Sequence, residues 1–398
     1  MTHLSRPRSP VILAVLWLSV AAGRAHTPNQ IPSRLAGVRR TFPQTEFYAT
    51  PTPLPPGKPG ELIRAQEFDE YTLGDGVNAV RILYHSRAAD GEDVAASGVV
   101  LFPDGQVPSG GWPVIAWAHA ENGVARDCAP SLARNLHNGP FLAMYVNLGY
   151  AVVASDYAGL GTSFRHAFAD MQSNATDVLH SVPAARAAVP QLGVRWVVMG
   201  DGAGGMTVAA VAELEQDIRD PNYLGGIVLS GLDDLQNIYH RSTGTVGGDM
   251  ALSLAYGIKT LYPQFEVGKI LTEKALSAYQ QMSKTCGDAS AQSRHTAAEM
   301  LRPDWERNHF ASQYLSRNRP GQKPGYGPLL VISGTQPDQG NTTAAVARMC
   351  RQGDQVQFDQ YLGSNAGQVL GDSVTEQIAW IRARFAGKPA PSNCYHNH

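Results

Sequence analysis

The sequence predicts an α/β fold with a mainly parallel sheet and helices on both faces. Short apolar runs typical of buried strands occur at 78–85, 96–102, 113–118, 151–155, 196–199, 226–229 and 329–332. From residue 151 onward these runs alternate with segments that predict helices at 172–188, from about 204, at 342–351 and at 373–385. This alternation is typical of βαβ units. The chain has 398 residues, 43% hydrophobic and 17% charged, which is enough for a large buried core and excludes intrinsic disorder.

The first 25 residues predict a secretory signal peptide. Arg6 and Arg8 precede an apolar stretch at 11–22, and small residues follow it up to Ala25. The stretch is shorter than the roughly 20 residues that a membrane-spanning helix needs, so we expect no transmembrane segment, with a retained short anchor as the alternative. The protein is therefore predicted to be secreted or extracellular, or periplasmic in a bacterial host.

Four further segments follow the signal peptide. Residues 26–66 are rich in proline and predict an extended surface arm. Residues 67–232 and 323–398 carry the alternating pattern and form the two parts of the predicted core. Residues 233–322 lack a strong strand run and predict a helical insertion. Ligands in such folds bind outside the carboxyl ends of the strands, so we expect this insertion to cap a pocket there.

Charge and cysteine content restrict the partners. The formal net charge is -2, which gives no basic face for nucleic acid. No CxxC occurs, and we expect neither a metal nor a cofactor. The four cysteines of an exported chain predict disulfides, and of the three connectivities we favour Cys128–Cys286 and Cys350–Cys394.

The most informative motif is the glycine-rich turn after the run at 196–199. Gly200-Asp201-Gly202-Ala203-Gly204-Gly205 lies between a predicted strand and a predicted helix. That is the context of the nucleophile elbow, G-x-S-x-G, which needs small residues two before and two after the nucleophile. Gly200 and Gly204 have this spacing around position 202, but Gly202 has no side chain and cannot attack a substrate.

Several other segments carry a family resemblance. They include Phe47-Tyr48, Trp117-Ala118-His119, Cys128-Ala129-Pro130-Ser131, the run at 149–162 and Ala345-Val346-Ala347-Arg348-Met349-Cys350. In combination the chain resembles the secretory lipase (lipase A-like) family of α/β-hydrolases over most of the mature sequence. The resemblance implies an α/β-hydrolase fold and a lipase or carboxylic ester hydrolase activity.

The same resemblance locates a catalytic triad whose members are absent here. The family reads like G-H-S-Q-G-G at the elbow, so Asp201 and Gly202 replace its histidine and its catalytic serine. Pro337 stands where the family resembles G-T-x-D, and Ala366 stands where it has the catalytic histidine. A Ser-His-Asp hydrolase needs a nucleophile, a base and an acid that orients the base. No member of that triad is intact in this sequence.

Around the elbow, His119, Ala120, Glu121, Asp201 and Ala203 are the candidate pocket and oxyanion residues. A carboxylate at Glu121 would oppose an oxyanion unless it is protonated or turned away. We expect His119 to have a structural hydrogen-bonding role, and Asp156 with Tyr157 to stabilise a loop.

Three function classes follow. The first is a catalytically inactive homologue, a pseudo-lipase that binds a lipid or an acyl chain. The second is an active triacylglycerol lipase or carboxylesterase whose site is rebuilt around His119, Glu121 and Asp201. The third is a non-catalytic surface interaction scaffold.

Overall fold

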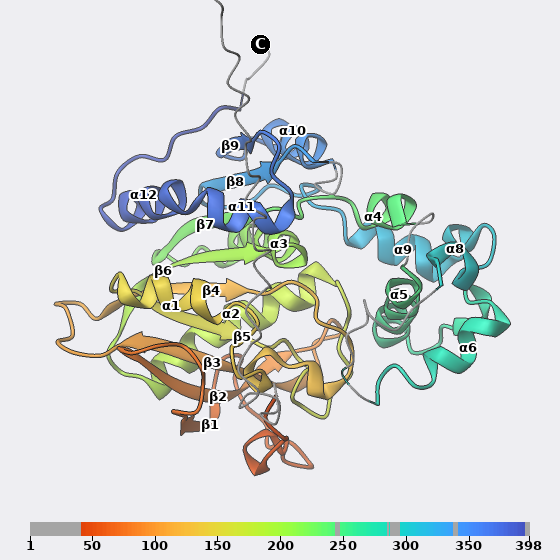
Figure 1. The fold of residues 1–398 in the computed structure, drawn as a ribbon, viewed down its shortest axis with the longest axis horizontal. Helices are drawn as coiled ribbons and strands as arrows, with labels where there is room; N and C mark the ends of the chain where they lie inside the picture. Colours follow the sequence, from red (N-terminus) through yellow and green to blue (C-terminus); the bar gives the residue numbers. More distant parts are fainter. Residues whose placement is uncertain (1–40, 243–246, 285, 287–294, 337–340, 395–398) are drawn as a thin grey trace, which may run out of the picture. The chain divides into compact units, whose positions relative to one another are not determined.

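The computed structural model describes residues 41–242, 247–284, 286, 295–336 and 341–394. The signal peptide prediction and most of the predicted arm lie outside the described residues. Nine strands form one sheet in the order β1-β2-β3-β5-β4-β6-β7-β8-β9 (Figure 1). Pairing is antiparallel from β1 through β2 and β3 to β5, and parallel across the rest of the sheet.

The strand boundaries follow the predicted apolar runs, with two additions. The strands are β1 (Leu62–Glu67), β2 (Val77–Arg87), β3 (Asp93–Pro103), β4 (Trp112–Ala118), β5 (Ala151–Ser155), β6 (Leu192–Asp201), β7 (Tyr223–Leu229), β8 (Leu329–Gly334) and β9 (Val356–Tyr361). β1 begins inside the range assigned to the proline-rich arm. β9 was not predicted, because it is an edge strand of mixed polar sequence that is only partly buried.

Helices cover both faces of the sheet, as predicted. Successive residues of a strand point to opposite faces, so Val197 and Val198 belong to two different core clusters. The cluster of Val198 includes residues of α2 (Met171–Ala188), α3 (Ala203–Ile218) and α10 (Thr342–Gln352). The cluster of Val197 includes residues of α1 (Gly139–Asn147), α11 (Ala366–Asp372) and α12 (Val374–Phe385).

The predicted insertion is helical where the structure describes it. It contains α4 (Leu235–Ser242), α5 (Gly248–Leu261), α6 (Glu273–Tyr279), α8 (Ala297–Met300) and α9 (His309–Arg317), together with an isolated bridge between Leu271 and Leu301. Figure 1 shows these helices grouped beside the strands rather than over the faces of the sheet. We call this group of helices the cap.

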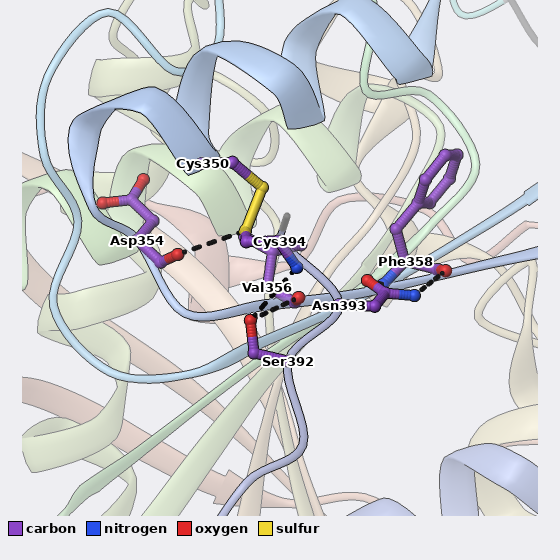
Figure 2. The surroundings of a disulfide bond; sticks show 7 residues. All are labelled: Cys350, Asp354, Val356, Phe358, Ser392, Asn393 and Cys394. Atoms are coloured by element: carbon purple, nitrogen blue, oxygen red, sulfur yellow. Dashed lines mark hydrogen bonds between the residues drawn. A yellow bond between two sulfur atoms is a disulfide. The ribbon is translucent and has the colours of Figure 1, made fainter. Parts of the chain in front are cut away.

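Both predicted cysteine pairings are present as disulfides. Cys128–Cys286 joins a loop of the core to the cap, and Cys350–Cys394 joins α10 to the C-terminal tail. Figure 2 shows how hydrogen bonds hold the tail against β9: the Asn393 side chain accepts from Phe358 N and donates to Phe358 O, both at 2.8 Å. The tail therefore covers the exposed edge of β9, which would otherwise offer unpaired backbone groups.

No helix in the described part of the chain is long and apolar enough to cross a membrane.

Candidate functional site

The turn between β6 and α3 has the geometry of a nucleophile elbow. Strand β6 ends at Asp201, Gly202 adopts φ 57° and ψ -122°, and α3 begins at Ala203. The flanking glycines are required sterically, because a Cβ on Gly204 would lie 2.0 Å from the backbone oxygen of Ala118. L-residues rarely adopt the positive φ of Gly202, and glycine adopts it without steric cost. The fold thus keeps the elbow while position 202 has no nucleophilic atom.

Three of the positions that the sequence assigned to the site, Ala120, Gly202 and Ala366, lie at one edge of the sheet. A Cβ on Gly202 would lie 3.3 Å from the Ala120 side chain, and one on Gly231 would lie 2.6 Å from Gly202 Cα. Beside Gly231, the Ser230 hydroxyl lies 3.4 Å from the backbone oxygen of Ala366. Ala366 therefore lies on the same edge of the sheet as the elbow, and it carries no imidazole. Pro337, the third position, lies outside the described residues.

Glu121 is turned away from the elbow. Its Oε2 accepts a hydrogen bond from His166 Nε2 at 3.0 Å, and its Oε1 accepts from Ala169 N at 2.6 Å and from Asn174 Nδ2 at 3.2 Å. Burial raises the pKa of Glu121, but the charge and the hydrogen bond of His166 outweigh this effect and leave the pKa below its usual value. The carboxylate is therefore ionised, and both of its oxygens accept hydrogen bonds from these three donors.

His119 has the geometry of a structural residue. Its Nδ1 lies 2.6 Å from Ala120 O, its Nε2 lies 3.2 Å from Asp156 O, and its ring stacks on Tyr157 with centroids 4.1 Å apart. Burial lowers the pKa of His119 to about 4, because the backbone carbonyls only partly offset the loss of water. The ring is neutral at physiological pH: Nδ1 can accept from Asn122 Nδ2 at 3.2 Å, while Nε2 donates to the backbone oxygen of Asp156.

Asp201 is a half-buried carboxyl at the elbow. Burial raises its pKa to about 7, with a smaller opposing effect from the Gly202 backbone N–H. A carboxyl with such a pKa can exchange a proton near neutrality. It is not at the nucleophile's place, however, because the positive φ belongs to Gly202 and Asp201 is still the last residue of β6.

Asp156 and Tyr157 hold the loop after β5. The Asp156 carboxylate accepts from Ser97 Oγ at 2.7 Å and from Ser131 N at 2.8 Å. Tyr157 has φ 68° and donates its hydroxyl proton to the backbone oxygen of His119 at 2.9 Å. These contacts link the loop after β5 to the loop after β4. Within the described residues, no group of three or more His, Cys, Asp or Glu side chains is placed to hold a metal ion.

No sequence pattern predicted the partners of Glu121. His166 follows it by 45 residues and Asn174 by 53, and these separations match no motif. The disulfide also reaches this loop, because Cys286 Sγ lies 3.7 Å from the backbone oxygen of Asn122. The loop that follows β4 is thus fixed by contacts that only the fold brings together.

Comparison with known proteins agrees with this geometry. The family model described as "Secretory lipase" matches residues 138–393, which is more than half of the chain. No curated protein sequence matches the chain significantly. The family model identifies the family of the chain. Whether the chain catalyses a reaction depends on the residues at its elbow.

Solved structures with the same fold are distant in sequence. Closed-state lipase A of Candida antarctica is 16% identical, with 88% of each chain covered and a TM-score of 0.75. The rice cell wall degrading esterase LipA of Xanthomonas oryzae is 19% identical, with 84% of this chain and 100% of that chain covered and a TM-score of 0.70. A putative hydrolase of Legionella pneumophila is 18% identical, covers 83% of this chain and 100% of that one, and has a TM-score of 0.69. At these identities the similarity shows the α/β-hydrolase fold alone.

Proposed function

Because this chain belongs to the secretory lipase family yet has glycine at the apex of its elbow, we propose that it is a catalytically inactive member that binds a lipid or an acyl chain. We propose in addition that residues 1–25 direct its export. Sequencing the N-terminus of the mature protein tests this second statement. A protein that retains Met1 after export would contradict it.

The observation that carries the proposal is the elbow itself. Gly202 occupies the strained turn between β6 and α3, where an ester hydrolase of this fold needs an activated hydroxyl. Ala366 lies on the same edge of the sheet and supplies no base. Ester cleavage through an acyl-enzyme needs a nucleophile to attack the ester and a base to remove its proton, and both are absent from these positions.

The contacts of the remaining polar residues do not favour rebuilt hydrolytic chemistry. His119 is neutral and directed at backbone carbonyls, while Glu121 is held by His166. Of the three residues His119, Glu121 and Asp201, only Asp201 has a pKa near neutrality. A single carboxyl without a positioned partner does not replace the nucleophile that Gly202 lacks. The residues at the elbow therefore argue against an active esterase.

Three features support a bound apolar ligand at this edge. Ala120, Gly202, Ala203 and Ala366 are small and only half-buried, so a ligand can approach the backbone closely. The cap is tied to the neighbouring loop through Cys286. The solved relatives are named as lipases or esterases, so an acyl group is the ligand class that their shared fold suggests. A fold alone does not confer activity. The protein therefore binds an acyl ligand at this edge but does not hydrolyse it.

Binding can be tested with cis-parinaric acid, a fluorescent fatty acid. Ala120→Trp places an indole against Gly202 and should weaken binding at least tenfold. Val194→Trp is the matched control, because Val194 is 58% exposed at the start of β6, and it should bind as the wild type does. Equal binding by both variants, or no saturable binding by the wild type, would contradict the proposal that the ligand binds at this site.

The absence of hydrolysis is tested separately. Wild-type protein should show no fluorophosphonate labelling and no ester turnover above a denatured control. Labelling that maps to one residue of repurified protein would establish rebuilt chemistry instead.

A further inference from the structure

A buried ion pair joins the loop after β4 to the loop after β5. Glu121 Oε2 and His166 Nε2 are 3.0 Å apart, and their side chains are 10% and 1% exposed. Removing one partner of such a buried pair destabilises the folded protein, because the other charge is then buried without a counter-charge. Neither residue has a role in the binding proposed above.

The hydrogen bonds of both side chains fit the charged forms. His166 Nε2 faces the Glu121 carboxylate, and its Nδ1 faces the backbone oxygen of Ala158 at 3.3 Å. A neutral imidazole donates from one nitrogen only, whereas the imidazolium donates from both. Glu121 in turn faces three donors, from His166, Ala169 N and Asn174 Nδ2. The protonated histidine and the ionised glutamate thus satisfy every one of these contacts.

The segment that carries His166 is also where the cap is attached. Helix α5 packs directly on this segment: a Cβ on Gly257 would lie 2.8 Å from the backbone oxygen of Phe168, and the Thr260 hydroxyl, 3.0 Å from Tyr256 O, is also 3.3 Å from the backbone oxygen of His166. From α9, Tyr314 donates to the backbone oxygen of Phe168, and Arg317 Nε donates to Asp170 Oδ1 at 2.7 Å. The same short segment is therefore bonded to Glu121 on one side and to two cap helices on the other.

We propose that the Glu121–His166 pair is a pH-dependent link that fixes cap helices α5 and α9 to the core at neutral and mildly acidic pH and loosens them in alkaline solution. Loss of the proton from His166 leaves the buried Glu121 carboxylate without a counter-charge. The least costly response is for the segment at 166–170 to separate from the loop after β4, which shifts the backbone groups that hold α5 and α9.

The signs of the two pKa shifts give the pH range. Burial lowers the pKa of His166, but the charge and hydrogen bond of Glu121 outweigh burial and raise it above its ordinary value. The stabilisation from His166 is therefore complete below its unfolded pKa and is lost as pH rises through the raised pKa. The lowered pKa of Glu121 acts at the other end, where stabilisation is lost as pH falls through it.

The other titratable groups near the pair do not replace the charge of His166. Burial keeps His119, in the loop after β4, neutral by lowering its pKa to about 4. Asp177 of α2 raises the pKa of His166, and its own pKa is raised to about 6 by burial. Three phenols interact with Glu121, and burial raises the pKa of each well above its usual value: Tyr157 in the loop after β5, Tyr239 of α4 and Tyr314 of α9. Arg317 is engaged by Asp170.

Hydrogen exchange measured by mass spectrometry on the full mature protein tests the link. Protection factors, corrected for the intrinsic pH dependence of exchange, are compared at pH 6 and pH 9 for peptides of α5, α9 and β6. We expect protection in α5 and α9 to fall about tenfold or more, which corresponds to about one pKa unit of lost interaction. The measurement is made in an Asp201→Asn background, which removes the carboxyl of β6 that titrates in this range, and protection in β6 should then stay within about twofold.

The double variant Glu121→Gln, His166→Gln removes both charges and should lose this pH dependence in the cap. His240→Gln is the matched control, because the His240–Glu306 pair is 2.9 Å apart but His240 is 55% exposed, and it should behave as the wild type. Should the double variant not fold, the imidazole proton resonances of His166 are followed in the wild-type protein. A neutral His166 at pH 6, or equal loss of protection in cap and core, would overturn the proposal.

Discussion

Replacing Gly202 by serine, the first step in restoring the elbow, should destabilise the protein. Gly202 has φ 57° and ψ -122°, a conformation that costs a residue with a Cβ about 1–3 kcal/mol. The new Cβ would also lie 3.3 Å from Ala120 Cβ, so Ala120 must give way by a few tenths of an ångström. We therefore expect Gly202→Ser to lower the free energy of unfolding by about 1–3 kcal/mol.

Urea unfolding of Gly202→Ala and Gly202→Ser, each alone and with Ala120→Gly, separates the two contributions. Ala120→Gly removes the close contact but leaves the backbone strain. Gly371→Ala is the matched control, because Gly371 lies inside α11, has no positive φ, and its added Cβ meets nothing within 4 Å. That control should be stabilised by up to about 1 kcal/mol. A Gly202→Ala variant as stable as the wild type would refute the assignment of a strained elbow.

Activity should return only when the triad is restored as a unit. Gly202→Ser alone should give little ester turnover, because a serine without a histidine is a weak neutral nucleophile. Adding Ala366→His and Pro337→Asp should give more than the single changes combined. Glu121 should be left in place, since Glu121→Thr would leave the buried charge of His166 without its partner. Additive or absent recovery in the triple variant would refute the alignment of these positions.

Three further predictions concern stability. Replacing Cys350 and Cys394 together by alanine should cost about 2–4 kcal/mol in thermal unfolding, and an unchanged melting temperature would contradict a stabilising role for this bond. Asp201→Asn should stabilise the protein more at pH 8 than at pH 4, because the folded pKa of Asp201 is raised to about 7 and its ionisation opposes folding as pH rises through this range; urea unfolding at the two pH values checks it. Met199→Ala should cost about 2–5 kcal/mol by the same assay, because Met199 is fully buried in β6, and a smaller cost would contradict its place in the core.

The amino-acid sequence was sufficient for the elements that depend on local patterns. Apolar runs of the length of a strand located β4 to β8, because strands buried on both faces need continuous apolar residues. The glycines at 200 and 204 identified the elbow, because an added Cβ at either position would clash with backbone, and Gly202 between them adopts a positive φ without steric cost. The two disulfides were also predicted correctly. Strand β9 was missed because its polar edge sequence resembles a loop.

The direction of a polar side chain was decided only by the tertiary structure. The sequence alone predicted only that Glu121 lies among the candidate oxyanion residues. The fold turns it toward His166, Ala169 and Asn174, which the crossover connections bring to it from 45 to 53 residues away. Local patterns encode which face of a strand is buried, since that depends on neighbours along the chain. The partner of a buried charge depends on which loops meet at one edge of the sheet, and that is set by packing of the whole core.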